Sequence, residues 1–216
     1  MQAECLPEQG IQEVEFVSEL AEIDNRIKGL VAFASLEFGP KAIEPLLKYP
    51  RVTGVRRMIK SEADPDFCLR PDFVKGVRAL AQYGFSFALG IKPQHLLNAA
   101  RLIELCPDVK FVVDHFAQPD IRRHKLDPWR HDLRRIAEFP NVFCKISSLA
   151  TEADHLHWHI GDLQPYLEAV MEIWGPKRLM WGSDWPVSTQ AMTIPQSVSV
   201  LEALFPGVIY KLQCHL

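Results

Sequence analysis

The sequence lacks the features that mark nucleic-acid-binding and membrane proteins. Its 24 Lys and Arg residues stand against 27 Asp and Glu residues, for a formal net charge of −3, and they form no basic stripe. Without such a stripe a nucleic-acid partner is not indicated. No apolar run approaches the roughly 18–20 residues of a membrane-spanning helix. We therefore expect neither a nucleic-acid nor a membrane partner.

The first residues do not predict a secretory signal, and the cysteines do not predict a disulfide framework. The first residues, MQAECLPEQGIQEVEF, carry acidic side chains where a signal peptide has basic residues followed by an apolar stretch. The cysteines are odd in number and show no C-x-x-C spacing; they are Cys5, Cys68, Cys106, Cys144 and Cys214. Reduced thiols account for this pattern, and the apolar surroundings of Cys106 and Cys144 place both in the core. We therefore expect a cytoplasmic protein.

What the sequence does contain is a set of short apolar runs, in a chain that is 48% hydrophobic and 24% charged. Most of these runs are continuous rather than alternating, which is typical of strands buried on both faces in a parallel sheet. The predicted strands are Gly29–Leu36, Val52–Ile59, Phe85–Ile91, Val109–His115, Val142–Ser147 and Arg178–Gly182.

Amphipathic segments lie between these runs, and four of them open on a proline that suits a first helical turn. The predicted helices are Glu13–Ile23, Pro71–Tyr83, Pro93–Leu105, Pro128–Phe139, Pro165–Trp174 and Ile194–Leu204. Strands recur roughly every 25–35 residues, the length of a βαβ unit. No linker divides the chain, so we expect one α/β domain over residues 1–216. Alternation alone also fits a doubly wound open sheet, although no G-x-G-x-x-G motif follows any strand.

Polar side chains gather at the carboxyl ends of the predicted strands, where parallel α/β folds hold their sites. They are Arg56, Arg57, Asp114, His115, Lys145, Asp184 and Trp185. Burying a charge costs several kcal/mol unless it is paired, so apolar strands do not need such residues for stability. The clustering therefore indicates a functional site.

Each of these residues also has a structural alternative. Asp184 serves either as a general base or metal ligand or as the cap of a turn. His115 polarises a carbonyl, binds a metal, or is a satisfied core histidine. Of Arg56 and Arg57, one must face inward, where it clamps a substrate carboxylate or pairs with a buried acid such as Asp114.

Lys145 has the same two alternatives, with a structural ion pair slightly favoured. The remaining histidines carry less information. The alternating histidines of the loop TEADHLHWHIGD are usually solvated, and a metal site there is the less favoured interpretation; they are His155, His157 and His159. We expect the other three on the surface; they are His95, His124 and His131.

Several motifs together resemble the amidohydrolase-related family, the branch of metal-dependent-hydrolase barrels that holds sugar-acid lactonases. Gly182-Ser183-Asp184-Trp185-Pro186 is the most specific of them. The others are Gly54-Val55-Arg56, Asp114-His115 and Lys145-Ile146-Ser147, which the resemblance places on the fourth, sixth and seventh barrel strands. The resemblance covers nearly the whole chain.

The resemblance implies a (β/α)8 TIM-barrel hydrolase that opens a sugar-acid or related lactone. Asp184 would activate water, and His115 would lie beside the scissile carbonyl. In metal-binding members both would hold one divalent ion, with zinc favoured, while other members need no metal. Arg56 would hold a polar or anionic part of the small-molecule substrate. The further substrate contacts would be Arg57, Lys145 and Trp185.

The chain departs from the family pattern in ways that make the barrel incomplete. Its 216 residues are few against the ~250 of such a barrel. The family's first strand ends in an H-x-H pair, and the chain opens instead on Met1–Glu4, which resembles the tail of strand two. Gln118 replaces a lysine that often follows the D-H pair. We therefore expect an N-terminally incomplete barrel that lacks strand 1.

Two other functions stay open. One is a decarboxylase of the same barrel superfamily, acting on an aromatic or unsaturated acid. The other is a catalytically inactive, incomplete barrel, because loss of a strand exposes unpaired sheet edges. The sequence predicts no particular oligomeric state.

Overall fold

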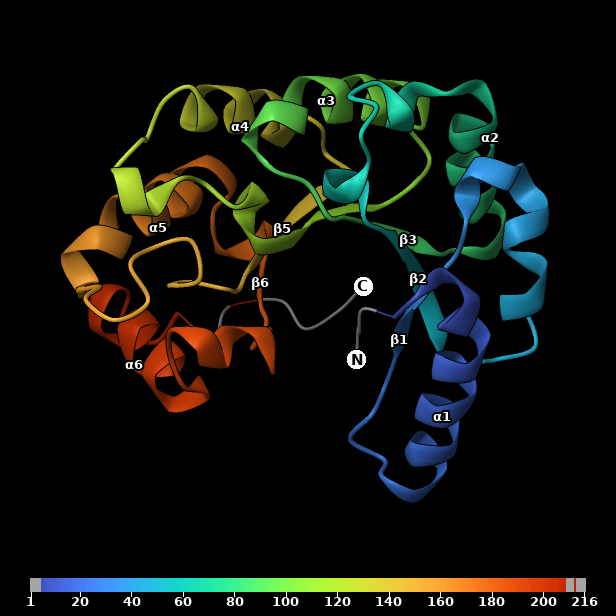
Figure 1. Cartoon of the computed structure of the whole chain (residues 1–216), viewed down its shortest axis with the longest axis horizontal. Coiled ribbons are helices and arrows are strands. Elements are labelled where there is room, and N and C mark those ends of the chain that lie inside the picture. Colours follow the sequence, from blue (N-terminus) through green and yellow to red (C-terminus); the bar gives the residue numbers. More distant parts are fainter. Residues whose placement is uncertain (1–4, 209–211, 213–216) are drawn as a thin grey trace. The chain divides into compact units, whose positions relative to one another are not determined.

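The computed structural model describes residues 5–208 and residue 212, and Figure 1 shows their α/β arrangement. The strands are β1 (Leu30–Phe33), β2 (Val52–Arg57), β3 (Ser86–Leu89), β4 (Phe111–Val113), β5 (Val142–Ile146) and β6 (Leu179–Trp181). The α-helices are α1 (Gly10–Ile23), α2 (Pro71–Ala79), α3 (Leu96–Leu105), α4 (Trp129–Ala137), α5 (Ile160–Trp174) and α6 (Ile194–Leu204). Each predicted strand is present, so the apolar runs were interpreted correctly.

The six strands form a sheet whose order follows the chain, from β1 to β6. The register of β1 on β2 is parallel, with Ala32 opposite Val55, and β5 on β6 is parallel as well, with Lys145 opposite Met180. Within the described residues β1 and β6 each have one strand neighbour, so the described sheet is not a closed barrel. The predicted tail of strand two, Met1–Glu4, lies outside the described residues, and the missing first strand stays a prediction.

The start of α5 differs from the sequence-based expectation. The helix begins at Ile160, so Pro165 lies inside it rather than in its first turn. The cause is a capping box: the backbone N–H of His159 donates to Asp162 Oδ2 at 2.7 Å, which satisfies one end of the helix five residues earlier. Pro165 itself lacks the N–H that would bond to Gly161.

By its internal contacts the chain divides into two compact units. Among the described residues, unit 1 comprises 5–90 and 98–112, and unit 2 comprises 91–97, 113–208 and 212. The single domain expected over residues 1–216 stays a prediction.

Unit 1 has an aromatic core. Phe67, Phe73, Phe87 and Phe111 form a chain of ring contacts with centroids 5.0, 6.0 and 6.0 Å apart, mostly tilted or edge-to-face as aromatic pairs prefer. Helix α2 comes close to the segment that follows β1, because a Cβ on Gly76 would lie 2.4 Å from the carbonyl oxygen of Leu36. That position therefore requires glycine.

The core of unit 2 is built around Trp129, which is 2% exposed. Its ring contacts those of Phe116 and Tyr166, at centroid distances of 6.3 and 5.5 Å. Its indole N–H donates to the carbonyl oxygen of Phe116 at 2.8 Å. This bond ties α4 to the turn that follows β4, which carries His115.

None of the described helices combines the length and the apolar character needed to span a bilayer. The longest of them, α5, has 15 residues.

Candidate active site

His115 and Asp184 lie next to each other in unit 2. His115 comes two residues after β4, and Asp184 comes three residues after β6. The imidazole Nε2 is 3.7 Å from Asp184 Oδ1, and the two side chains are 9% and 16% exposed. This distance suits an ion pair but exceeds a hydrogen bond. The geometry therefore leaves Oδ1 and Nε2 near enough to act on one substrate.

Two consecutive serines contact this pair. Ser147 Oγ lies 2.7 Å from His115 Nδ1, on the ring edge away from Asp184. The hydroxyl of Ser148 donates to Asp184 Oδ2. Both serines are buried, at 1% and 4% exposure, directly after β5. The four side chains thus form a continuous polar cluster in which each serine holds one member of the His115–Asp184 pair.

The backbone of the cluster is strained. His115, Ser148 and Asp184 have φ values of 51°, 55° and 52°, in the left-handed region that glycine favours. The strain continues after His115, through residues 116–118. Each such residue costs roughly 1–2 kcal/mol. Strain of this kind persists where the surrounding structure enforces it, and it concentrates at functional sites.

A structural ion pair lies in the same unit. Lys145 Nζ donates to Asp114 Oδ1 at 2.6 Å, and the Asp114 side chain is fully buried. The structural alternative for Lys145 is therefore confirmed, while its substrate contact stays a prediction. Burial raises the pKa of the neighbouring Cys144 thiol, and the Asp114 carboxylate adds to this effect. Cys144 is a core residue, as predicted, and Cys106 is buried as well.

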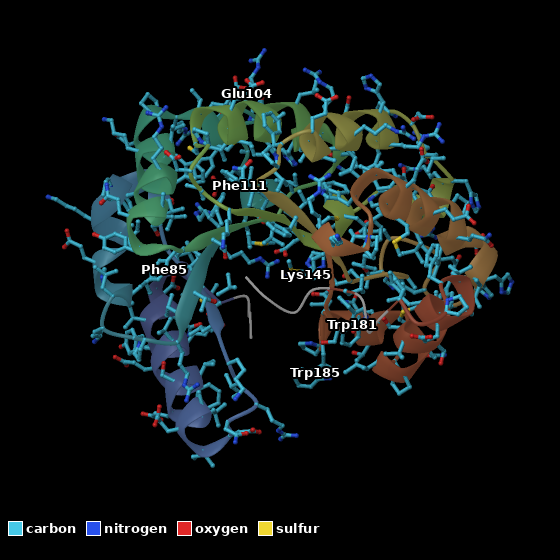
Figure 2. The ribbon with its side chains drawn as sticks, turned by 180° about the vertical axis from the view of Figure 1, so that it is seen from behind. Phe85, Glu104, Phe111, Lys145, Trp181 and Trp185 are labelled. Atoms are coloured by element: carbon cyan, nitrogen blue, oxygen red, sulfur yellow. The ribbon has the colours of Figure 1, made fainter. Side chains whose placement is uncertain are left out.

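Trp185 is largely solvent-exposed, at 67%. Figure 2 labels it in the segment after β6, with Trp181 on the strand itself and Lys145 on β5. The Trp181 indole donates to Ser197 Oγ at 3.3 Å and so serves packing. An exposed ring next to Asp184 in sequence is accessible to a ligand, but its substrate contact stays a prediction.

The two predicted arginines belong to unit 1. Arg57 is bound within that unit: its guanidinium donates to Glu37 Oε1 and Oε2 at 3.0 and 3.2 Å and to Glu62 Oε1 at 2.5 Å. It also stacks 5.0 Å from the ring centroid of Phe67. Arg56 is buried at 9% exposure. Their substrate contacts stay predictions, and neither is counted in the unit 2 cluster.

One histidine expectation is wrong. His95 is 7% exposed rather than on the surface, because its Nδ1 accepts the backbone N–H of Lys92 at 3.1 Å where the helix begins. Burial lowers its pKa. The other two are exposed as expected: the side chains of His124 and His131 are 70% and 72% accessible.

The described side chains do not fit a metal centre. Within residues 5–208 and 212, no three His, Cys, Asp or Glu side chains come together as a ligand set, the histidines of the 155–159 loop included. His115 and Asp184 supply one nitrogen and one oxygen, whereas a zinc site uses three or four protein ligands. We therefore derive no step through a metal, and the zinc ion stays a prediction.

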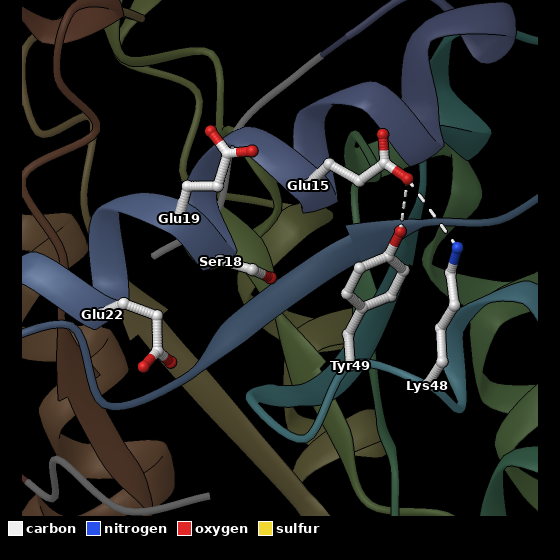
Figure 3. A pocket seen from close by; sticks show the side chains of 6 residues that line it. All are labelled: Glu15, Ser18, Glu19, Glu22, Lys48 and Tyr49. Carbon is white, nitrogen blue, oxygen red and sulfur yellow. Dashed lines mark hydrogen bonds and ion pairs between the residues drawn. The ribbon is translucent and has the colours of Figure 1, made fainter.

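A shallow depression of about 490 Å³ lies on unit 1, shown in Figure 3. Its lining comes from α1 and the loop before β2: Glu15, Ser18, Glu19, Glu22, Lys48 and Tyr49. The Tyr49 hydroxyl donates to Glu15 Oε1 at 2.7 Å, and Lys48 Nζ is 3.7 Å from the same oxygen. None of the six is a predicted site residue.

Sequence reasoning missed the roles of Ser147 and Ser148. Their position at the end of a strand was a usable signal, because every other member of the cluster was found in that way. A serine at a strand end is too common to stand out, and neither its partner nor a positive φ can be read from the residue type.

The comparisons with known proteins agree on one family. A family model described as Amidohydrolase matches residues 11–206. The L-fucono-1,5-lactonase of Burkholderia ambifaria is 30% identical over 190 residues, which cover 87% of this chain and 64% of the relative. A second L-fucono-1,5-lactonase, from Burkholderia multivorans, is 30% identical over 208 residues, covering 89% of this chain and 69% of the relative.

The solved structures give the same result. A crystal structure of an amidohydrolase from Burkholderia multivorans with bound zinc superposes with a TM-score of 0.84 at 28% identity, covering 95% of this chain and 74% of that chain. The chain thus spans just under two thirds of the length of the Burkholderia ambifaria relative. With a family model that matches nearly its whole length, the chain belongs to the amidohydrolase family.

Proposed function

We propose that the protein hydrolyses a sugar-acid lactone, with Asp184 as the general base. The observation that carries this proposal is the 3.7 Å approach of the Asp184 carboxylate to His115 Nε2 in a buried, strained cluster. Two relatives that are 30% identical are named L-fucono-1,5-lactonases, which supports a cyclic ester of a sugar acid as the substrate class.

The chemistry requires a deprotonated water and a stabilised oxyanion. In the proposed reaction Asp184 takes a proton from water, and the resulting hydroxide adds to the lactone carbonyl. His115, which lies beside that carbonyl, stabilises the tetrahedral oxyanion. When the ring C–O bond breaks, the leaving oxygen takes the proton back from Asp184. The product is a ring-opened hydroxy acid.

The remaining substrate contacts belong to the same proposal. Lys145 and Trp185 are the unit 2 residues that we propose as further substrate contacts. Lys145 is only 17% exposed and already bound to Asp114, so its contribution would be electrostatic. Trp185 offers an accessible apolar face on which a sugar ring can rest.

The test replaces Asp184 by Asn, which keeps the shape and tolerates the left-handed backbone but cannot accept the proton. On a panel of sugar-acid lactones that includes L-fucono-1,5-lactone, acid release by Asp184→Asn should fall about 10²–10⁴-fold, the usual contribution of a general base. Asp108→Asn, at an exposed carboxylate, is the matched control and should not change turnover.

Wild-type turnover that Asp184→Asn retains would remove Asp184 as the base. Release of carbon dioxide from an aromatic acid, without any lactone opening, would replace the proposal by a decarboxylase. Buffer-only reactions must be subtracted throughout, because lactones open spontaneously.

We also infer a cytoplasmic location. Cys68, Cys106 and Cys144 form no disulfide and are all buried, which is the usage of a reducing compartment. Burial raises the pKa of Cys68 and of Cys106 to about 11, so neither thiol is reactive near neutral pH. Cell fractionation with detection of the native protein tests this location.

A further inference from the structure

Ser147 and Ser148 are adjacent in sequence, yet their hydroxyls reach the two different members of the His115–Asp184 pair. We propose that this serine pair is a positioning device, which fixes the imidazole and the carboxylate relative to each other for lactone hydrolysis. The proposal rests on the proposed function and adds two residues to it. Neither serine is itself a catalytic residue.

Burial excludes Ser147 as a nucleophile. Its side chain lies in a residue that is 1% exposed, so a lactone carbonyl cannot reach its Oγ. Its hydroxyl is instead directed at His115 Nδ1, at 2.7 Å. This contact fixes the rotation of the ring and leaves Nε2 facing Asp184. A hydrogen bond at one ring nitrogen also sets which form the other nitrogen takes.

Ser148 acts on the other group. Its hydroxyl donates to Asp184 Oδ2, which leaves Oδ1 as the oxygen nearer to His115. The donor thereby selects which carboxylate oxygen faces the imidazole. Because Ser148 is 4% exposed, it also has no access to substrate.

The backbone explains how one dipeptide serves both partners. Ser147 directly follows β5, while Ser148 has a φ of 55° and leaves the strand in the left-handed region. Asp184 and His115 have positive φ values as well. Positive φ values at His115, Ser148 and Asp184 therefore bring the four polar side chains together, and the two serine hydroxyl contacts hold this arrangement.

A positioning role predicts a specific kinetic signature. The serines do not touch substrate, so their loss should leave KM nearly unchanged while kcat falls. Misplacement of a reacting group by 1 Å, or loss of a supporting hydrogen bond, costs about 10- to 100-fold in rate. We expect a decrease of this size for Ser148→Ala, and a similar one for Ser147→Ala.

The decisive experiment compares Ser148→Ala with Ser148→Gly. Both variants lack the hydroxyl, but glycine relieves the left-handed backbone and alanine does not. If the hydroxyl positions Asp184, the two variants lose kcat equally although Ser148→Gly has the higher Tm. Ser148→Asn, which tolerates a positive φ and carries an amide donor, should recover part of the lost kcat.

His124→Gly is the matched control for the backbone. His124 has a φ of 52° in unit 2, and its side chain is 70% exposed outside the cluster. This variant should gain Tm without any change in kcat.

The proposal is overturned if Ser148→Ala and Ser148→Gly both keep the wild-type kcat. It is also overturned if glycine restores the rate that alanine loses, because Ser148 would then matter only for backbone strain. These outcomes differ from failure of the proposed function, which shows as lactone turnover that survives in Asp184→Asn.

Discussion

Charged side chains at strand ends behave differently in the two units. At the end of β2, Arg57 is held by Glu37 and Glu62 in hydrogen bonds of 2.5–3.2 Å. After β4 and β6, His115 and Asp184 face each other at 3.7 Å, beyond hydrogen-bond distance. In the first cluster the arginine donates hydrogen bonds to two carboxylates of its own unit. In the second, His115 Nε2 and Asp184 Oδ1 face each other without a hydrogen bond between them.

The backbone conformation also differs between the two regions. Arg57 lies within a regular strand, whereas His115 and Asp184 both have positive φ values. A strained backbone needs support from its surroundings, and natural chains accept this cost mostly where function requires a special geometry. Local geometry, rather than the presence of charge, therefore distinguishes a structural cluster from a candidate site.

Lys145 gives the most direct test of this comparison, and its substitution has the largest expected effect on stability. Lys145→Met should lower the free energy of unfolding by about 3 kcal/mol, because the fully buried Asp114 loses the ammonium at 2.6 Å. Chemical denaturation measures the change. The exposed Lys125→Met should stay within about 0.5 kcal/mol of wild type.

If Lys145→Met instead folds with normal stability and a raised KM, the lysine serves the substrate. Lys145 would then join His115 and Asp184 in the site, and the contrast with Arg57 of unit 1 would become sharper. A loss of stability with KM unchanged would show that the Lys145–Asp114 ion pair is structural.

The fold was the more predictable part of the molecule. Strands β3 and β4 are buried at every position, which a continuous apolar run predicts for a parallel strand. Strands β1 and β5 alternate buried and half-buried positions, yet their apolar runs marked them as well. The start of α5 was missed for a local reason: Pro165 looked like a first-turn residue, but the His159–Asp162 capping box begins the helix earlier. Such reciprocal caps depend on side-chain geometry that proline placement does not reveal.

The site was predictable only in part. His115 and Asp184 could be selected because strand ends meet at one edge of a parallel sheet. Their distance and the serine contacts could not, since these depend on left-handed turns that non-glycine residues rarely adopt. The intramolecular partners of Arg57 were also hidden, because Glu37 lies in a short 3-10 helix and Glu62 directly follows another, and no periodicity encodes the direction of such short segments.

Arg57 tests the other side of the comparison, with a smaller expected effect. Arg57→Leu should lower the free energy of unfolding by about 2 kcal/mol, because Glu37 and Glu62 would be left facing each other at a half-buried position. Thermal melts of this variant and of Arg26→Leu, whose guanidinium is exposed, give the matched pair. A raised KM for the lactone without loss of stability would make Arg57 a substrate residue.

The smallest effect concerns His95, which is as buried as His115, at 7% exposure, but lies outside the cluster. Burial holds the pKa of His95 below its ordinary value of 6.5, and Nδ1 must stay unprotonated to accept the Lys92 N–H. The unfolded chain therefore takes up this proton at a higher pH than the folded one. The stability that the neutral ring contributes is complete above pH 6.5 and is lost as the pH falls below it.

Melting curves between about pH 5 and about pH 8 should accordingly show a weaker pH dependence in His95→Gln than in wild type. Identical slopes would mean that the burial of His95 carries no proton linkage.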